Sequence, residues 1–356
     1  MKAKQIRAQY DAQNGITVKK HKSRRIALTG LAAAAVLLVG GAVTVGAVND
    51  WNYGAVFNRY FTEKSGEPVS FDYTGMGLNI GKEITGDGFT LTVQSVMADS
   101  SNVYIAYDIA LSREISETVC PDDSTTVSLL LSPAIMDGDT MLNRGGSEFP
   151  AVRGDDGIWH GITVIEKDAG TDLNGKQLVL RHIAEQESNK EDADKLIFIG
   201  YDYNNPDGTC KKMQLSAPDF DLHFDLSGIT VQQGKTLPYG GTLPNDANNN
   251  IFDTVTVTPF MLRFESSGTI GVMDSAPKWG MVFDNDAIAV SYTAVYADGT
   301  ELALRRIRNG MNHSMTVRRP DGRYDWDLVR TYCFDTPFSL DGLTAIRIND
   351  TVIPIA

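Results

Sequence analysis

The longest apolar segment of the chain covers residues 26–48 and contains no charged side chain. A helix rises about 1.5 Å per residue, so this segment is roughly 34 Å long and exceeds a hydrocarbon core of about 30 Å. Five basic residues precede it: Lys19, Lys20, Lys22, Arg24 and Arg25. The C-terminal side continues with Asn49 and Asp50. The positive-inside rule therefore predicts a cytoplasmic tail over residues 1–25, a transmembrane helix over 26–48 and an extracellular remainder.

The alternative interpretation of this segment is a cleaved signal peptide. The apolar region of a signal peptide is about 7–15 residues long, and cleavage needs small residues in a small-x-small arrangement. The segment here is longer, and residues 45–48 match the cleavage pattern poorly. We therefore predict an uncleaved membrane anchor.

Aromatic residues follow the apolar segment at helical spacing. Tyr53, Phe57, Tyr60 and Phe61 share one face of a helix, and Trp51 falls where lipid headgroups are expected. This pattern predicts a short juxtamembrane helix that lies either on the membrane or on the first folded domain. Residues 49–68 are thus predicted to contain this helix, followed by a polar linker over 62–68.

From residue 71 onward the pattern changes to the alternation that is typical of β-strands. Residues 89–94 and 103–111 alternate on either side of a polar turn and predict a hairpin. Further strands are predicted at 127–131, 159–165, 177–183, 196–201, 220–226, 251–258, 261–265, 287–296, 301–304, 315–318, 328–334, 345–349 and 352–355. Asp298-Gly299 and Asp321-Gly322 are typical hairpin turns. Many short strands indicate an all-β ectodomain.

The passage 232–250 is polar, rich in Gly, Asn and Pro, and without a period. It predicts a boundary between two β-sandwich domains, 69–227 and 228–356.

Charge divides the chain at the predicted span. The whole chain carries a net charge of −13, and residues 1–25 hold eight basic side chains and one acidic side chain, which leaves −20 for the rest. A strongly acidic ectodomain excludes nucleic acid as a partner, because phosphate attraction supplies most non-specific affinity. The basic tail predicts the lipid bilayer as a partner, although topology alone explains its charge.

No arrangement of residues predicts catalysis, a cofactor or a metal ion. The five histidines are scattered and match no HExxH, GxSxG or P-loop pattern. His223 lies between Asp221 and Asp225, but this spacing is typical of a solvated strand face. Cys120, Cys210 and Cys333 are compatible with one disulfide and one thiol, or with three buried thiols, and we favour the thiols.

The hairpin residues 86–99 (GDGFTLTVQSVMAD) and 103–109 (VYIAYDI) resemble a Gram-positive family of membrane-anchored ectodomain proteins. The family is of unknown function and is associated with regulation by extracytoplasmic-function sigma factors, as anti-sigma-factor-like proteins. Residues 252–262 and 343–355 resemble the immunoglobulin-like domain that commonly follows. The resemblance implies two tandem immunoglobulin-like β-sandwiches after a single N-terminal transmembrane helix.

The resemblance also implies a non-enzymatic single-pass regulator or envelope sensor, whose tail contacts a sigma factor and whose ectodomain meets an unidentified envelope ligand. The apolar residues available for the tail contact are Ile6, Tyr10, Ile16 and Val18. A tail of 25 residues is too short to form a helical domain. Either a short peptide folds on contact with the sigma factor, or the lineage has lost that role. The alternative function is a surface-anchored adhesion or cell-wall-binding module with no signalling role.

Overall fold

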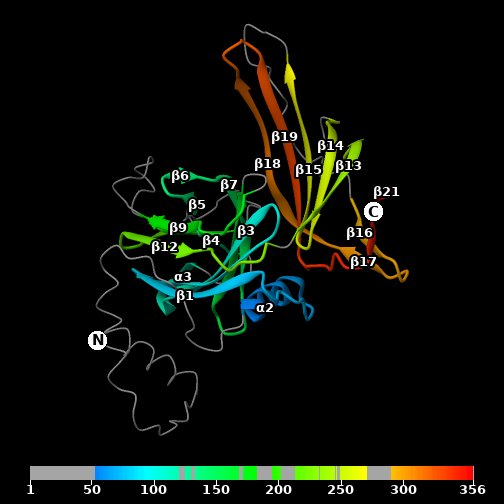
Figure 1. The fold of residues 1–356 in the computed structure, drawn as a ribbon. Helices are drawn as coiled ribbons and strands as arrows, with labels where there is room; N and C mark the ends of the chain where they lie inside the picture. Colours follow the sequence, from blue (N-terminus) through cyan, green and yellow to red (C-terminus); the bar gives the residue numbers. More distant parts are fainter. Residues whose placement is uncertain are drawn as a thin grey trace. The chain divides into compact units, whose positions relative to one another are not determined.

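The computed structural model describes residues 53–119, 125–129, 133–167, 171–182, 195–201, 213–231, 233–244, 246, 249–270 and 290–355 (Figure 1). All of these belong to one compact unit, Val43–Ala356. Within them, no helix is both long enough and apolar enough to cross a membrane. The predicted span over 26–48 lies outside the described residues.

The described residues form two helices and 21 strands, so the prediction of an all-β ectodomain is confirmed. The helices are α2 (Tyr53–Ser65) and α3 (Arg113–Val119). The strands of the first half are β1 (Gly77–Gly86), β2 (Phe89–Ala98), β3 (Asn102–Leu111), β4 (Thr125–Leu129), β5 (Ala134–Asp137), β6 (Thr140–Met141), β7 (Asn143–Arg153), β8 (Trp159–Lys167), β9 (Gln177–His182), β10 (Lys195–Tyr201), β11 (Met213–Ser216) and β12 (Phe220–Asp225). Those of the second half are β13 (Lys235–Thr242), β14 (Ile251–Thr258), β15 (Met261–Ile270), β16 (Tyr292–Tyr296), β17 (Glu301–Leu304), β18 (Arg306–Arg318), β19 (Tyr324–Phe334), β20 (Leu343–Ile348) and β21 (Thr351–Pro354).

The first half is built on a five-stranded sheet in the order β1-β2-β3-β8-β7. The predicted hairpin is confirmed, because β2 pairs with β3 in antiparallel register from Phe89↔Leu111 to Ala98↔Val103. One face of this sheet packs against two smaller sheets, β11-β10-β4 and β12-β9-β5-β6, through two hydrophobic clusters. The opposite face carries Tyr104, Ala106, Ile162 and Val164, and it packs against α2. Strict alternation along β3 and β8 thus gives the sheet two buried faces.

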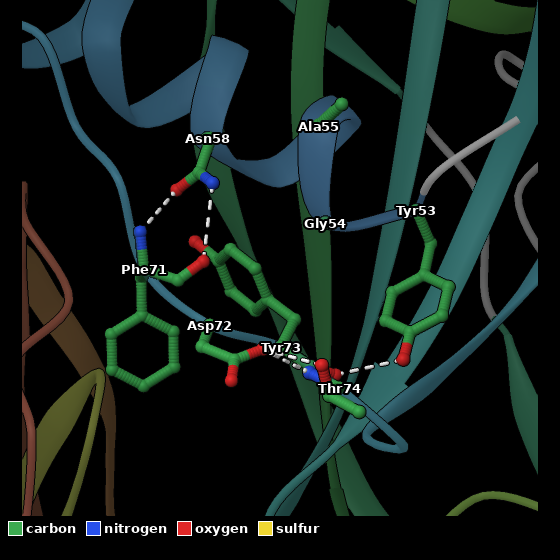
Figure 2. A pocket seen from close by; sticks show the side chains of 8 residues that line it. All are labelled: Tyr53, Gly54, Ala55, Asn58, Phe71, Asp72, Tyr73 and Thr74. Atoms are coloured by element: carbon green, nitrogen blue, oxygen red, sulfur yellow. Dashed lines mark hydrogen bonds between the residues drawn. The ribbon is translucent and has the colours of Figure 1, made fainter.

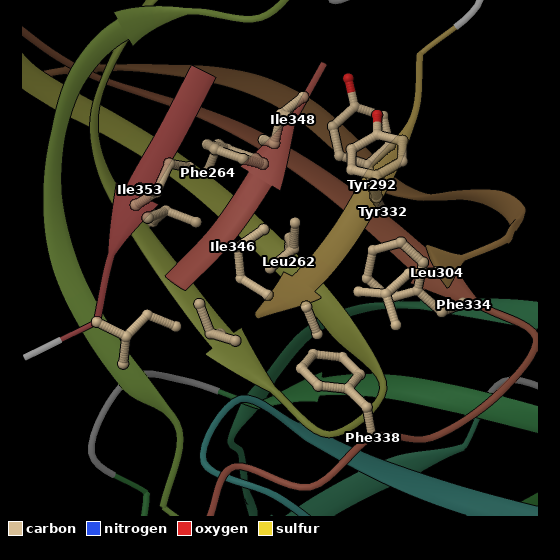
Figure 3. Close-up of a cluster of buried hydrophobic side chains, with 14 of the residues drawn as sticks. Leu262, Phe264, Tyr292, Leu304, Tyr332, Phe334, Phe338, Ile346, Ile348 and Ile353 are labelled. Carbon is tan, nitrogen blue, oxygen red and sulfur yellow. The ribbon is translucent and has the colours of Figure 1, made fainter. Parts of the chain in front are cut away.

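The second half consists of two sheets, β13-β14-β15-β19-β18 and β17-β16-β20-β21. Both contribute to a single hydrophobic cluster, in which Phe264 and Tyr332 of the first sheet meet Tyr292, Ile346 and Ile348 of the second (Figure 3). The predicted Asp-Gly turns join β16 to β17 and β18 to β19. Their glycines adopt positive φ angles, which residues with a Cβ rarely adopt.

Two parts of the sequence prediction are wrong. The passage 232–250 contains a strand, β13, which pairs with β14 around a bulge between Pro238 and Gly241. The bulge and the proline conceal the alternation, as is common on an edge strand. The predicted linker 62–68 begins too early, because α2 continues to Ser65.

The sequence analysis also missed β1, β5, β6 and β11, and it missed the long strand β7. Register shifts between Asn143 and Gly145 and between Phe149 and Val152 interrupt its alternation. Because a bulge changes the face to which the following side chains point, a strand with two bulges has no continuous period.

The two halves meet at a shared cluster beneath α2. Phe57, Tyr60 and Phe61 of the helix are at most 1% exposed and pack together with Phe260 and Met261, which lie where β14 turns into β15. The predicted aromatic face of the helix is therefore confirmed, and it lies on the folded domain. α2 consequently belongs to the core of both halves.

Candidate functional site beneath the first helix

The helix α2 positions the candidate site. Its helical period places the buried aromatic residues on one face and the charged residues next to that face. Phe57, Tyr60 and Phe61 lie at i, i+3 and i+4 and face the sheet. Arg59 and Glu63, four residues apart, lie together beside this apolar face. The helix thereby places a cation and a carboxylate over the middle of the sheet.

Asp108 of β3 is the carboxylate that receives Arg59. It is 8% exposed and shares a sheet face with Tyr104 and Ala106 because residues two apart in a strand point the same way. Nη2 of Arg59 lies 3.0 Å and 3.1 Å from the two carboxylate oxygens. The side-chain amide of Gln94 donates a further hydrogen bond of 2.5 Å, and Nδ1 of His160 lies 2.6 Å from Oδ1. This buried carboxylate thus holds the helix and two strands together.

His160 of β8 is held in one orientation by Asp108. A carboxylate only accepts hydrogen bonds, so Nδ1 of His160 must carry the proton that it donates. In the neutral imidazole, Nε2 then bears a lone pair. Nε2 lies 3.6 Å from Oε1 of Glu63 and 3.5 Å from Oδ1 of Asp156, and it has no hydrogen-bond partner among the described residues.

Burial affects Glu63 directly. It raises the pKa of the Glu63 carboxyl above its ordinary value, and the nearby His160 and Arg59 oppose that rise only in part. One of its oxygens, Oε2, lacks a hydrogen-bond partner among the described residues. The helix therefore presents a partly desolvated carboxyl to the ring nitrogen of His160.

Gly154 makes this convergence sterically feasible. A Cβ at this position would lie 2.8 Å from Nε2 of His160 and 2.9 Å from both the Asp156 and the Glu63 oxygens. Any side chain at residue 154 would push these three polar groups apart. The close approach therefore depends on glycine.

Asp99 closes the turn between β2 and β3 at the contact between the halves. Its Oδ1 accepts hydrogen bonds from the backbone N–H groups of Ser101 and Asn102, at 2.8 Å and 2.9 Å, and its Oδ2 accepts one of 2.7 Å from the hydroxyl of Tyr104. Burial raises its pKa above the ordinary value, although these hydrogen bonds act in the opposite direction. The Tyr104 ring packs 4.9 Å from the ring of Phe260, so the turn is connected to the second half.

Polar contacts also join the halves at the end of β8. The guanidinium of Arg263 on β15 contacts Glu166 on β8, and its Nη2 lies 2.7 Å from Oε1 of Glu265. Arg263 and Glu166 are 8% and 0% exposed. A groove of about 660 Å³ lies here, lined by Ser100, Ser101, Glu166, Lys167, Thr171, Asp172, Val231, Gln233, Gly234, Thr236, Thr256, Arg263 and Glu265.

A smaller hollow of about 280 Å³ lies at the start of α2. Figure 2 shows the residues that line it and the hydrogen bonds between them. The side chain of Asn58 accepts from the backbone N–H of Phe71 at 2.9 Å and donates to its carbonyl at 3.2 Å, and the Tyr53 hydroxyl donates to the carbonyl of Tyr73 at 2.8 Å. The chain after the helix is thereby fixed against the helix itself.

None of the predicted site residues is a member of the cluster at α2. The candidate tail contacts Ile6, Tyr10, Ile16 and Val18 lie outside the described residues, as do the membrane-flanking Lys19, Lys20, Lys22, Arg24, Arg25 and Trp51. His223 lies on an outer strand, with Nε2 3.0 Å from Asp221 and Nδ1 3.1 Å from Gln177. Cys333 is a buried thiol, whereas Cys120 and Cys210 lie outside the described residues.

Sequence reasoning missed the cluster of Arg59, Glu63, Asp108, Asp156 and His160. Its members come from α2, β3, β8 and the turn before β8, which are far apart in sequence. The available signal was a polar residue in an otherwise apolar strand, namely Asp108 and His160. Among the described residues, no group of three or more His, Cys, Asp or Glu side chains is placed so that it could hold a metal ion.

Residues 20–110 match a family described as a domain of unknown function, DUF4179. The matched range contains the predicted span, α2 and nearly all of the β2–β3 hairpin. Over these residues, the resemblance to a domain of unknown function is confirmed. No curated protein matches the sequence.

Two solved structures are distantly similar. A conserved domain protein from Bacillus anthracis is 10% identical with a TM-score of 0.37, and 78% of each chain is covered. The CupB6 tip adhesin from Pseudomonas aeruginosa is 9% identical with a TM-score of 0.10, over 76% of this chain and 96% of that chain. At these TM-scores, neither likeness carries an argument about fold or function.

Proposed function

We propose that the chain is a non-enzymatic, single-pass membrane protein that passes the state of an extracellular β-ectodomain to its cytoplasmic tail. In this proposal the ectodomain consists of two tandem immunoglobulin-like β-sandwiches. The tail acts on an extracytoplasmic-function sigma factor in the manner of an anti-sigma factor.

The observation that carries the proposal is the position of α2. This helix begins shortly after the predicted span ends, and it is buried in a cluster that contains residues of both halves. A juxtamembrane helix in a flexible linker would not follow movements of the ectodomain. A helix held by packing and by the contact between Arg59 and Asp108 moves with both halves and transmits their displacement to the span.

An envelope ligand would act by disturbing the contacts between the two halves. Buried ion pairs such as that of Glu166 with Arg263 are costly to leave half-formed, because an unpaired buried charge loses its solvation without compensation. A ligand that separates the halves would also disturb the aromatic cluster around α2. Signalling then requires no contact between the ligand and the membrane.

Two measurements test the proposal: co-purification of a sigma factor with the chain, and the output of a reporter gene that depends on that sigma factor. We expect the tagged full-length chain, isolated from its native host, to carry a sigma factor. Loss of the α2 contact in R59Q is expected to change the reporter. The matched control is R181Q, which removes the exposed ion pair between Arg181 of β9 and Asp221 of β12, 2.8 Å apart. This variant is expected to leave the reporter unchanged.

Two results would overturn the proposal: a chain that carries no sigma factor, together with a reporter that is indifferent to deletion of the gene. In that case binding of the intact protein to purified cell wall would favour the surface-anchored module instead.

A further inference from the structure

A buried nitrogen of His160 lies close to two carboxyl groups, one on α2 and one in the turn before β8. The His160 side chain is 2% exposed, and its Nε2 has no hydrogen-bond partner among the described residues. This nitrogen lies 3.6 Å from Oε1 of Glu63 and 3.5 Å from Oδ1 of Asp156, which is too long for hydrogen bonds. A buried ring nitrogen without a hydrogen bond is costly unless another group satisfies it.

One proton would satisfy both Nε2 and the Glu63 carboxyl. With Glu63 ionised and His160 neutral, both groups are acceptors, because the proton of the ring is on Nδ1 and is donated to Asp108. An added proton on Glu63 is donated to Nε2, and an added proton on Nε2 is donated to Glu63. The same two atoms are joined in either case, so the pair takes up this proton as a unit. Rotation of the Glu63 side chain, which is 22% exposed, can bring the two atoms to hydrogen-bond distance.

The charges around Glu63 and His160 favour uptake of this proton. The charged groups that face the pair come from α2, β3 and the turn before β8, and they are Arg59, Asp108 and Asp156. The neighbours from β2 and β7, Gln94 and Val152, are uncharged. With a neutral imidazole, three carboxylates and one guanidinium give a net charge of −2, and one added proton reduces it to −1. Burial also raises the pKa of the Glu63 carboxyl, which acts in the same direction.

We propose that Glu63 and His160 take up one shared proton under mildly acidic conditions, and that this proton fastens α2 to β8. The two groups are apart in the unfolded chain, so the folded protein binds the shared proton more tightly. The contribution of the proton to the docking of α2 is therefore present at acidic pH and is lost as the pH rises. The helix that follows the predicted span is thus sensitive to pH. This docking is a property of the isolated protein and does not depend on a sigma factor.

The test is hydrogen exchange of the full-length protein in nanodiscs, followed by mass spectrometry from about pH 5 to about pH 8. The protection of the α2 amides is compared with that of the β15 amides in the same sample, which removes the pH dependence of the exchange chemistry. In the wild type, we expect the protection of α2 relative to β15 to fall at least about three-fold over this range, because a buried hydrogen bond is lost.

The variant E63Q separates the hydrogen bond from the proton. The amide nitrogen of glutamine donates to Nε2 at every pH, so α2 is expected to stay as protected as it is in the wild type at about pH 5. D156N removes a neighbouring negative charge and keeps the shape of the side chain. It is expected to move the transition to lower pH. Glu63 and Asp156 are 22% and 47% exposed, so both variants are expected to retain the fold.

The matched control is H223Q, which alters a half-exposed histidine whose Nε2 lies 3.0 Å from Asp221. This variant is expected to retain the transition of the wild type. Wild-type protection of α2 that does not change over the pH range, a transition that persists in E63Q, or loss of the transition in H223Q would overturn the proposal. None of these results bears on the sigma factor, so the two proposals fail separately.

Discussion

Phe61 of α2 stacks on Phe260, the residue between β14 and β15, with ring centroids 5.9 Å apart and planes inclined by 19°. Both rings are fully buried. Phe57 belongs to the same cluster, and Tyr53, the first residue of the helix, packs against it. The helix that follows the predicted span is therefore part of the core that the two halves share.

The first prediction concerns this aromatic contact. F61A removes a buried ring and is expected to lower the free energy of unfolding by about 3–5 kcal/mol, because the surrounding residues cannot collapse fully into the space. F61L retains most of the volume and is expected to cost less than half as much. Urea unfolding of the full-length protein in detergent, monitored by tryptophan fluorescence, measures both variants. Equal, small effects would show that α2 contributes little to the core.

The second prediction concerns the contact of Arg59 with Asp108. Arg59 is 39% exposed, so solvent screens the pair and R59Q is expected to cost about 1–2 kcal/mol of stability. R59K is expected to cost less, because a single nitrogen, Nη2, contacts both carboxylate oxygens and an ammonium group can partly replace it. R181Q, at an exposed pair, is expected to change stability by less than about 0.5 kcal/mol. A cost in R181Q as large as in R59Q would contradict a special role for the pair at α2.

The sequence identified most of the strands because alternation survives wherever a strand has regular pairing. The β9–β12 pair and the β14–β15 pair are of this kind. The prediction failed at β1, β7 and β13, where bulges shift the register and the apolar residues no longer recur at every second position. It also failed at β5, β6 and β11, which have at most four residues each. Local pattern therefore misses some bulged strands and some short ones.

The sequence pattern did not predict the candidate site, and the reason is different. Asp108 and His160 lie opposite each other on neighbouring strands, as their pairing in the β3–β8 register shows. Glu63 approaches them only because α2 packs across the sheet. A single sequence does not reveal which strands are neighbours, so it offered five scattered histidines where the structure shows one buried histidine among carboxylates.

The third prediction concerns the pH dependence of stability at Asp99. Burial raises the pKa of this carboxyl in the folded protein, so the folded chain binds the proton at a higher pH than the unfolded chain does. The contribution of Asp99 to stability is then fully present below the ordinary pKa of about 3.9 and is lost as the pH rises through the folded-state pKa. The side chain of D99N does not titrate. The free energy of unfolding of the wild type, relative to that of D99N, is therefore expected to be highest at acidic pH.

Unfolding curves of the wild type and D99N at matched pH values measure this difference. Other carboxyl groups titrate equally in both proteins, so their contributions cancel. A difference that instead grows toward neutral pH would mean that the hydrogen bonds from Ser101, Asn102 and Tyr104 outweigh the effect of burial.

The fourth prediction concerns Gly154, where the three polar groups of the site converge. G154A places a methyl group within 2.9 Å of the His160, Glu63 and Asp156 side chains, and it is expected to cost about 1–3 kcal/mol because they must move apart. The φ angle of Gly154 is not positive, so crowding and not backbone strain is the cause. A double-mutant cycle with E63A separates crowding from backbone strain. E63A empties part of the crowded space, so it is expected to reduce the loss of stability caused by G154A by at least about 0.5 kcal/mol. If the two variants are additive, the methyl group does not meet Glu63, and the convergence of the three groups at this turn would have to be abandoned.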